Sequence, residues 1–260
     1  MLFRSLEYIP GTWKQTPPAK NRGYANHLIA AEKAVFVSLN RYERKKKIDL
    51  AIHAFAELPE EVARRSVLVI AGGYDADVRE NVEHLCELMA LAERLQQSDR
   101  IIFRCSISND ERAALMRKAT AVLYTPDREH FGIVPIESMF CGTPVVAVAS
   151  GGPLETILHN HTGFLCEQTP TAFAQAIARF VLEPQLSQQM GAEGKKRVEK
   201  LFTNDSFSVA LEEQMYQAYS RADAPRVRRF AFRAILAVLL GSVTVALLLY
   251  ITIHMFVHPQ

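Results

Sequence analysis

Two glutamates that bracket a short apolar stretch are the first candidates for chemistry in this sequence. Glu129 and Glu137 enclose the segment EHFGIVPIE, which carries one glycine and one proline. In a continuous helix, the two carboxylates would lie about 80° apart around the axis and more than two turns apart. In a loop that runs into a helix, both carboxylates could face one ligand instead.

The residues around this segment favour the loop that runs into a helix. The preceding AVLYTP (121–126) is typical of a strand, Gly132 permits close backbone approach, and Pro135 suits the first turn of a helix. Glu129 then lies in the loop and Glu137 lies in the opening turns of the helix. The amides at that helix start predict an anion site, and they belong to Phe131, Gly132, Ile133 and Val134. Carboxylates for hydroxyls beside amides for phosphate suggest a sugar nucleotide diphosphate.

A plain structural explanation fits the same spacing. Glu129 can be a solvated loop residue, and Glu137 can be a helix-start charge that the helix dipole favours. Spacing alone leaves both explanations open.

A basic run follows an earlier apolar stretch and could supply positive charge. Arg41 and then Lys45, Lys46 and Lys47 come directly after FVSLN (36–40). An arginine grips a phosphate with two parallel hydrogen bonds, whereas a lysine offers a mobile point charge. Taken alone, such a run is more often a solvated basic face or a short nuclear-import-like motif.

The elements that must position these residues form a regular series. Short runs rich in valine, isoleucine and alanine recur at 34–40, 66–73, 100–104, 121–126, 144–150 and 163–167, with amphipathic stretches between most of them. Because the runs are apolar almost throughout, they predict a parallel sheet covered on both faces. We therefore expect a doubly wound, Rossmann-like α/β domain. In such sheets ligands bind at the carboxyl ends of strands, where AGG (71–73) and SGG (150–152) add glycine turns.

Composition limits the class of protein. The chain has 260 residues, 49% of them hydrophobic and 22% charged, with a net charge of +2, which is the balance of a globular protein and gives no indication of nucleic acid as a partner. Its four cysteines form no CxxC pair, which argues against a zinc site and a disulfide framework. We expect a reducing compartment and no bound metal.

The C-terminal region departs from this average. Residues 234–253 carry no charge, and about twenty helical residues would cover roughly 30 Å, the thickness of a bilayer core. A buried core helix is the alternative. Arginines precede this stretch, so the positive-inside rule places the main domain in the cytosol, and the start of the chain lacks a secretory signal. We expect an irregular segment over 1–33, an α/β domain over 34–220, a basic linker over 221–233 and a transmembrane helix over 234–257.

Several motifs together carry a resemblance to a known family. EHFGIVPIE, the Arg41/Lys46 pair, and SGGPLETI followed by TGFLCE resemble the donor-binding domain of retaining glycosyltransferases of family 4, which have the GT-B fold. NRYERKK, LVIAGGYD, LYTPDREHFGIVPIESM and VASGGPLETI are similar to the α-1,3/1,6-mannosyltransferases of the dolichol pathway within that family. The similarity runs from about Ala34 to Tyr219.

The resemblance implies an activity and a role for each site residue. It implies transfer of mannose from GDP-mannose to dolichol-diphosphate-linked Man-GlcNAc₂ at the endoplasmic reticulum membrane, without a cofactor or metal, beside other dolichol-pathway glycosyltransferases. Arg41 and Lys46 would hold the diphosphate, and Glu129 would face mannose hydroxyls. Glu137 would accept hydrogen bonds from the ribose. The amides that would line the sugar and phosphates are those of Phe131, Gly132, Ile133 and Val134.

One departure from the family pattern leaves alternatives open. Such enzymes place an acceptor-binding α/β domain first, whereas only about thirty irregular residues precede the first predicted strand here. We therefore expect the donor-binding half of a mannosyltransferase. The main alternative is a catalytically inactive, membrane-anchored nucleotide-sugar-binding or scaffold subunit. A sugar phosphorylase shares the architecture, but no motif for its pyridoxal phosphate lysine supports it.

Overall fold

The computed structural model describes residues 33–221 and 224–257; within these ranges, the side chains of residues 221, 224–228 and 246–257 are not described. The predicted irregular segment over 1–33 lies outside the described residues except for Lys33. The chain divides into two compact units, Met1–Phe202 and Thr203–Gln260. The first unit holds the whole sheet and the candidate site.

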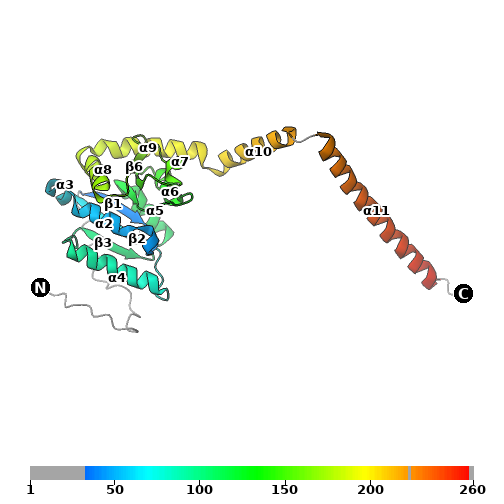
Figure 1. The fold of residues 1–260 in the computed structure, drawn as a ribbon, viewed down its shortest axis with the longest axis horizontal. Helices are drawn as coiled ribbons and strands as arrows, with labels where there is room; N and C mark the ends of the chain where they lie inside the picture. The colour runs from blue at the N-terminus through cyan, green and yellow to red at the C-terminus, as the bar shows by residue number, and fades with distance from the viewer. Residues whose placement is uncertain (1–32, 222–223, 258–260) are drawn as a thin grey trace. The chain divides into compact units, whose positions relative to one another are not determined.

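A six-stranded parallel sheet forms the centre of the first unit (Figure 1), in the order β3-β2-β1-β4-β5-β6. Each predicted apolar run coincides with one strand to within a residue or two at its ends, which confirms the α/β fold with a parallel sheet. The order reverses direction between β1 and β4, and ligands of such sheets bind at this switch point. The strands are β1 (Ala34–Leu39), β2 (Ser66–Gly72), β3 (Ile101–Cys105), β4 (Ala121–Tyr124), β5 (Val145–Val148) and β6 (Gly163–Cys166).

Helices connect successive strands, and two of them, α5 and α8, begin at side-chain caps. Ser108 and Glu111 form a capping box at the start of α5, and the Thr169 hydroxyl accepts a hydrogen bond from Ala172 N at the start of α8. The helices of this unit are the short 3₁₀ helix η1 (Arg44–Lys46), α2 (Ile48–Ala56), α3 (Glu60–Arg64), α4 (Arg79–Arg94), α5 (Asn109–Lys118), α6 (Ile133–Phe140), α7 (Pro153–Thr156), α8 (Pro170–Leu182) and α9 (Pro184–Leu201).

The strands bury side chains on both faces of the sheet, as their uninterrupted apolar composition predicts. On one face, strand residues such as Phe36 and Ile70 pack with α2, α4 and α8. On the other, Val37 packs in a cluster with Met116 of α5, while Val145 packs with residues of α6 and α9. Full burial of a valine, isoleucine, phenylalanine or methionine side chain contributes about 1.5–3 kcal/mol to the stability of the folded state. The two covered faces leave the strand ends as the place for a ligand.

The second unit contains α10 (Asn204–Arg221) and α11 (Ala224–Val257). Within the part of the chain that the structure describes, no helix has both the length and the apolarity that a membrane crossing requires. A span needs about 20 consecutive apolar residues, and only residues 234–245 of the predicted stretch have described side chains. The structure therefore does not support the predicted transmembrane helix over 234–257.

Candidate active site

A cavity of about 400 Å³ opens at the carboxyl ends of the strands beside the switch point. Its volume lies in the range of pockets that hold small ligands. Its walls come from the segment after β1, the glycines at the end of β2, the start of α5 and the segment from β4 to α6. The polar and glycine residues of the lining are Asn40, Arg41, Lys46, Gly72, Gly73, Asn109, Arg112, Tyr124, Glu129 and Gly132.

Lys46 and Glu129 meet in this cavity although they come from different strand exits. The Lys46 ammonium lies 2.6 Å from Oε2 of Glu129, and the two side chains are 15% and 29% exposed. The Thr125 hydroxyl, just after β4, donates to the Lys46 carbonyl at 2.7 Å and ties the two segments together. The sequence predicted both residues for one site, and the structure brings them into direct contact.

The SGG turn after β5 explains how the loop carrying Glu129 is held. Gly152 N donates to the Glu129 carbonyl at 2.7 Å. A Cβ atom on Gly151 would lie 2.3 Å from that same carbonyl oxygen, and one on Gly152 would lie 2.2 Å from the Phe131 oxygen. Gly151 also has a φ of +60°, which a glycine adopts without strain. The turn therefore contains glycines because two backbones touch there.

Tyr124 lines the cavity beside Gly132. Gly132 has a φ of +74°, and a Cβ atom on it would lie 3.2 Å from the Tyr124 hydroxyl. Burial, and then the nearby Glu129 carboxylate, raise the pKa of Tyr124 above its usual value. The phenol therefore remains neutral at physiological pH beside the Glu129 loop.

Arg41 lies at the mouth of the cavity, 63% exposed, with Nη1 3.0 Å from Oε1 of Glu43. Lys45 Nζ lies 3.0 Å from Oε2 of the same carboxylate, in an orientation that is not a hydrogen bond. Gly72, the last residue of β2, admits this segment, because a Cβ atom on it would lie 1.9 Å from the Asn40 oxygen. Glycines at the end of β2 and after β5 thus both allow a close approach of two backbones, one on either side of the switch point.

Glu137 forms an ion pair with Arg112 of α5, and its side chain is 35% exposed. Arg112 lines the cavity and Glu137 does not appear among the lining residues. The sequence missed Arg112, because one arginine in an amphipathic stretch carries no signal. Sequence analysis also missed Tyr124 and Asn109, because neither residue belongs to a motif that distinguishes it from the rest of its strand or helix.

The helix start that was predicted as an anion site is α6, and Gly132 precedes its first residue. Gly132, Ile133 and Val134 line the cavity. Phe131 does not appear in that lining; its ring packs edge-on against Phe202, with centroids 6.3 Å apart. Among the described residues, no group of three or more histidine, cysteine or acidic side chains could hold a metal ion.

A family match and two curated relatives both indicate a glycosyltransferase. The family described as Glycosyl transferases group 1 matches residues 22–197. The chain is 44% identical over 190 residues to human alpha-1,3/1,6-mannosyltransferase ALG2, covering 72% of this chain and 45% of that protein. It is 40% identical over 207 residues to the Dictyostelium discoideum protein of the same name, covering 75% and 48%. The chain thus spans about half the length of these curated relatives.

Solved structures show the same fold. Sucrose-phosphate synthase from Thermosynechococcus elongatus is 28% identical with a TM-score of 0.66, over 79% of this chain and 50% of that one. Anabaena HepE in complex with UDP-glucose is 25% identical with a TM-score of 0.62, over 79% and 53%. From the family match over more than half of its length, the chain belongs to the glycosyl transferases of group 1.

Proposed function

We propose that this chain is the donor-binding half of a retaining mannosyltransferase that uses GDP-mannose. The whole enzyme would transfer mannose to dolichol-diphosphate-linked Man-GlcNAc₂ at the endoplasmic reticulum membrane. The observation that carries the proposal is the Lys46–Glu129 pair inside the strand-end cavity. It puts a cation suited to phosphate next to a carboxylate suited to sugar hydroxyls. The 44% identity to human alpha-1,3/1,6-mannosyltransferase ALG2 supports mannose as the sugar.

The proposal gives each residue a role. Arg41 and Lys46 bind the diphosphate, and Glu129 accepts hydrogen bonds from the mannose hydroxyls. Glu137 accepts from the ribose, held in place by Arg112. The amides of Gly132, Ile133 and Val134, at the start of α6, lie nearest the phosphates and the sugar, and the Phe131 amide comes directly before them in the chain.

Donor binding would exchange partners within the cavity. Lys46 and Glu129 neutralise each other at 2.6 Å in the structure. With a donor bound, the ammonium turns to a phosphate oxygen and the carboxylate turns to the sugar. The ion pair is thereby replaced by two contacts to the ligand, each charge-assisted.

The same arrangement would stabilise the transition state. Transfer breaks the bond between C1 of mannose and the diphosphate, so negative charge grows on the leaving oxygen and positive charge grows on the sugar. Arg41, Lys46 and the α6 amides stabilise the first charge, and Glu129 stabilises the second. In this proposal the positive charges come from protein side chains, and no metal or cofactor takes part.

The alternative, a catalytically inactive scaffold subunit, also predicts that GDP-mannose binds, but it predicts no mannose transfer. The similarity to mannosyltransferases over 72% of the chain supports the enzyme instead. Placement at the endoplasmic reticulum membrane and association with other dolichol-pathway glycosyltransferases follow from the family resemblance and remain predictions.

Calorimetric titration of the chain with GDP and GDP-mannose tests the proposal. Both ligands should bind, and Lys46→Ala should weaken both, because they share the diphosphate. Losing a charge-assisted hydrogen bond costs about 1.5–3 kcal/mol, or roughly ten- to a hundredfold in affinity. UDP-glucose serves as the comparison ligand. The proposal is wrong if GDP-mannose does not bind, or if Lys46→Ala binds it as well as the parent does.

A further inference from the structure

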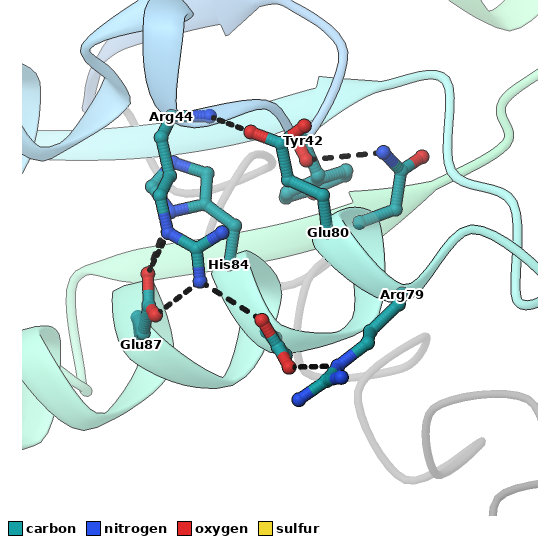
Figure 2. A network of polar contacts seen from close by, with 8 residues as sticks. Tyr42, Arg44, Arg79, Glu80, His84 and Glu87 are labelled. Carbon is teal, nitrogen blue, oxygen red and sulfur yellow. Dashed lines mark hydrogen bonds and ion pairs between the residues drawn. The ribbon is translucent and has the colours of Figure 1, made fainter.

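The segment that joins Arg41 to Lys46 is fastened to α4 by polar contacts (Figure 2). The Asn81 side chain donates to the Tyr42 carbonyl at 3.2 Å. Arg44 N donates to the Glu80 carboxylate at 3.0 Å. The Tyr42 hydroxyl donates to the Ile70 carbonyl of β2 at 3.1 Å. Backbone and side chains of this segment are therefore held before it reaches Lys46.

Arg44 makes the densest of these contacts. Its Nη2 lies 2.6 Å from Oε1 of Glu87 and 3.2 Å from Oε2 of Glu83, and its Nε lies 3.2 Å from Oε2 of Glu87. His84 Nδ1 lies 3.1 Å from the same Glu87 oxygen, on a side chain that is 6% exposed. Glu80, Glu83 and Glu87 recur at spacings of three and four, so they lie along one face of α4. The guanidinium therefore spans two carboxylates of a rigid helix.

These contacts divide the basic run into separate tasks. Arg41 and Lys45 contact Glu43, and Lys46 reaches Glu129 in the cavity. Arg44 is 46% exposed and does not appear in the cavity lining. The carboxylates of Glu87 and Glu83 raise the pKa of Arg44, and its guanidinium, like that of any arginine, is charged at physiological pH. The run is therefore more than a solvated basic face.

We infer that Arg44 is a positioning residue for donor binding, which acts by fixing η1 so that Lys46 points into the cavity. Arg44 and Lys46 are the first and last residues of this single 3₁₀ turn. After it, Lys47 takes a left-handed φ of 51° and α2 begins. A shift of the turn away from α4 moves Lys46 relative to Glu129. This inference rests on the proposed binding of a diphosphate by Lys46.

The test compares four variants of the full 260-residue chain by calorimetric titration with GDP: Arg44→Ala, Arg44→Lys, Glu87→Gln and Lys46→Ala. Arg44→Ala should weaken GDP binding about three- to fivefold, at the upper end of the effects of exposed ion pairs. Glu87→Gln should also weaken GDP binding, and it does so without a change in the sequence between Arg41 and Lys46. Arg44→Lys should recover part of the loss, because an ammonium keeps one contact but not the planar fork.

Arg64→Ala is the matched control, since it also removes one arginine from an exposed ion pair. Arg64 contacts Glu60 within α3 at 3.3 Å, and α3 precedes the amino end of β2, away from the cavity. It should leave GDP affinity unchanged. Thermal unfolding midpoints of all variants should stay close to that of the parent.

The double variant Arg44→Ala/Lys46→Ala distinguishes positioning from a general effect of charge. If Arg44 acts through Lys46, the double variant should bind GDP no more weakly than Lys46→Ala alone. Additive losses, or a loss equal to that of Arg64→Ala, would overturn the inference while leaving the proposed function intact. Absence of GDP binding by the parent, or unchanged binding by Lys46→Ala, would overturn both.

Discussion

Lys46 Nζ lies 2.6 Å from Glu129 Oε2, although the two residues are 83 positions apart in the chain. One comes from the segment after β1 and the other from the segment after β4, the two strands at which the sheet order reverses. A contact between opposite charges inside a candidate ligand cavity has a direct consequence for binding. A ligand must either compete with Glu129 for the Lys46 ammonium or form contacts of its own with both side chains.

Glu129→Gln should therefore improve GDP binding. The amide no longer neutralises Lys46, so GDP should bind about threefold more tightly. GDP-mannose loses a sugar contact worth about 1–2 kcal/mol, so its affinity relative to GDP should fall about five- to thirtyfold. Calorimetry with both ligands measures the ratio. Glu60→Gln on α3 is the control, and an unchanged ratio in Glu129→Gln would show that Glu129 does not contact the sugar.

Glu137→Gln should weaken GDP and GDP-mannose equally, by about 1–2 kcal/mol, because both carry the ribose. The effect should depend on the ribose hydroxyls. A 2′,3′-dideoxy analogue of GDP should bind the parent more weakly than GDP does, and it should bind Glu137→Gln and the parent alike. If the dideoxy analogue is as sensitive to Glu137→Gln as GDP is, the carboxylate acts on the site through Arg112 rather than on the ribose.

Gly151→Ala should cost more stability than Gly142→Ala. Both glycines have positive φ, at +60° and +79°, so both changes strain the backbone. A Cβ atom on Gly142 meets nothing within 4 Å, whereas one on Gly151 lies 2.3 Å from the Glu129 carbonyl. The extra clash should destabilise the fold by about 1–3 kcal/mol. Urea unfolding measures this difference, and equal midpoints for the two variants would contradict it.

The pH dependence of stability should report Tyr124. Burial and Glu129 hold the pKa of Tyr124 above its usual value of 10.0, so the folded state keeps this proton after the unfolded state loses it. The resulting stabilisation is present below pH 10 and is lost as the pH rises towards the folded-state pKa, by at most about 1.4 kcal/mol per pH unit. Tyr124→Phe should therefore lose less stability between pH 9 and pH 11 than the parent does. Parallel curves from urea unfolding would show that Tyr124 does not contribute.

The fold was predictable because the same sequence pattern, an apolar run followed by a helical stretch, occurs several times along the chain. Each strand is an apolar run, and six such runs separated by helical stretches fit one kind of sheet. The gathering of Arg41, Lys46 and Glu129 followed from the same pattern, since the ends of parallel strands share an edge. The partners that hold these residues were not predictable. The contacts of Arg112 with Glu137 and of Glu43 with Arg41 depend on the directions of the side chains in the folded protein, which sequence spacing does not specify.

The Arg44 network shows the same limit. In the sequence, Arg44 was one more charge in a basic run, and Glu83 and Glu87 were ordinary residues of an amphipathic helix. Their contacts depend on how α4 lies beside η1, which is set by packing rather than by local composition. The apolar stretch 234–253 is the opposite case. There a simple composition predicted a membrane span, which the described residues do not support.

The pairing of β1 with β4 also sets the order in which the site can arise during synthesis. The register joins Phe36 to Ala121, so β1 must wait for about eighty-five more residues before this neighbour exists. β2 can meanwhile pair with the other edge of β1 and β3 can pair with β2, because both strands are made before β4. A nascent chain that ends before β4 would therefore contain three of the six strands, with Lys46 present and its acidic partner Glu129 not yet made. The contact between Lys46 and Glu129 can therefore form only after the segment that follows β4 has been made.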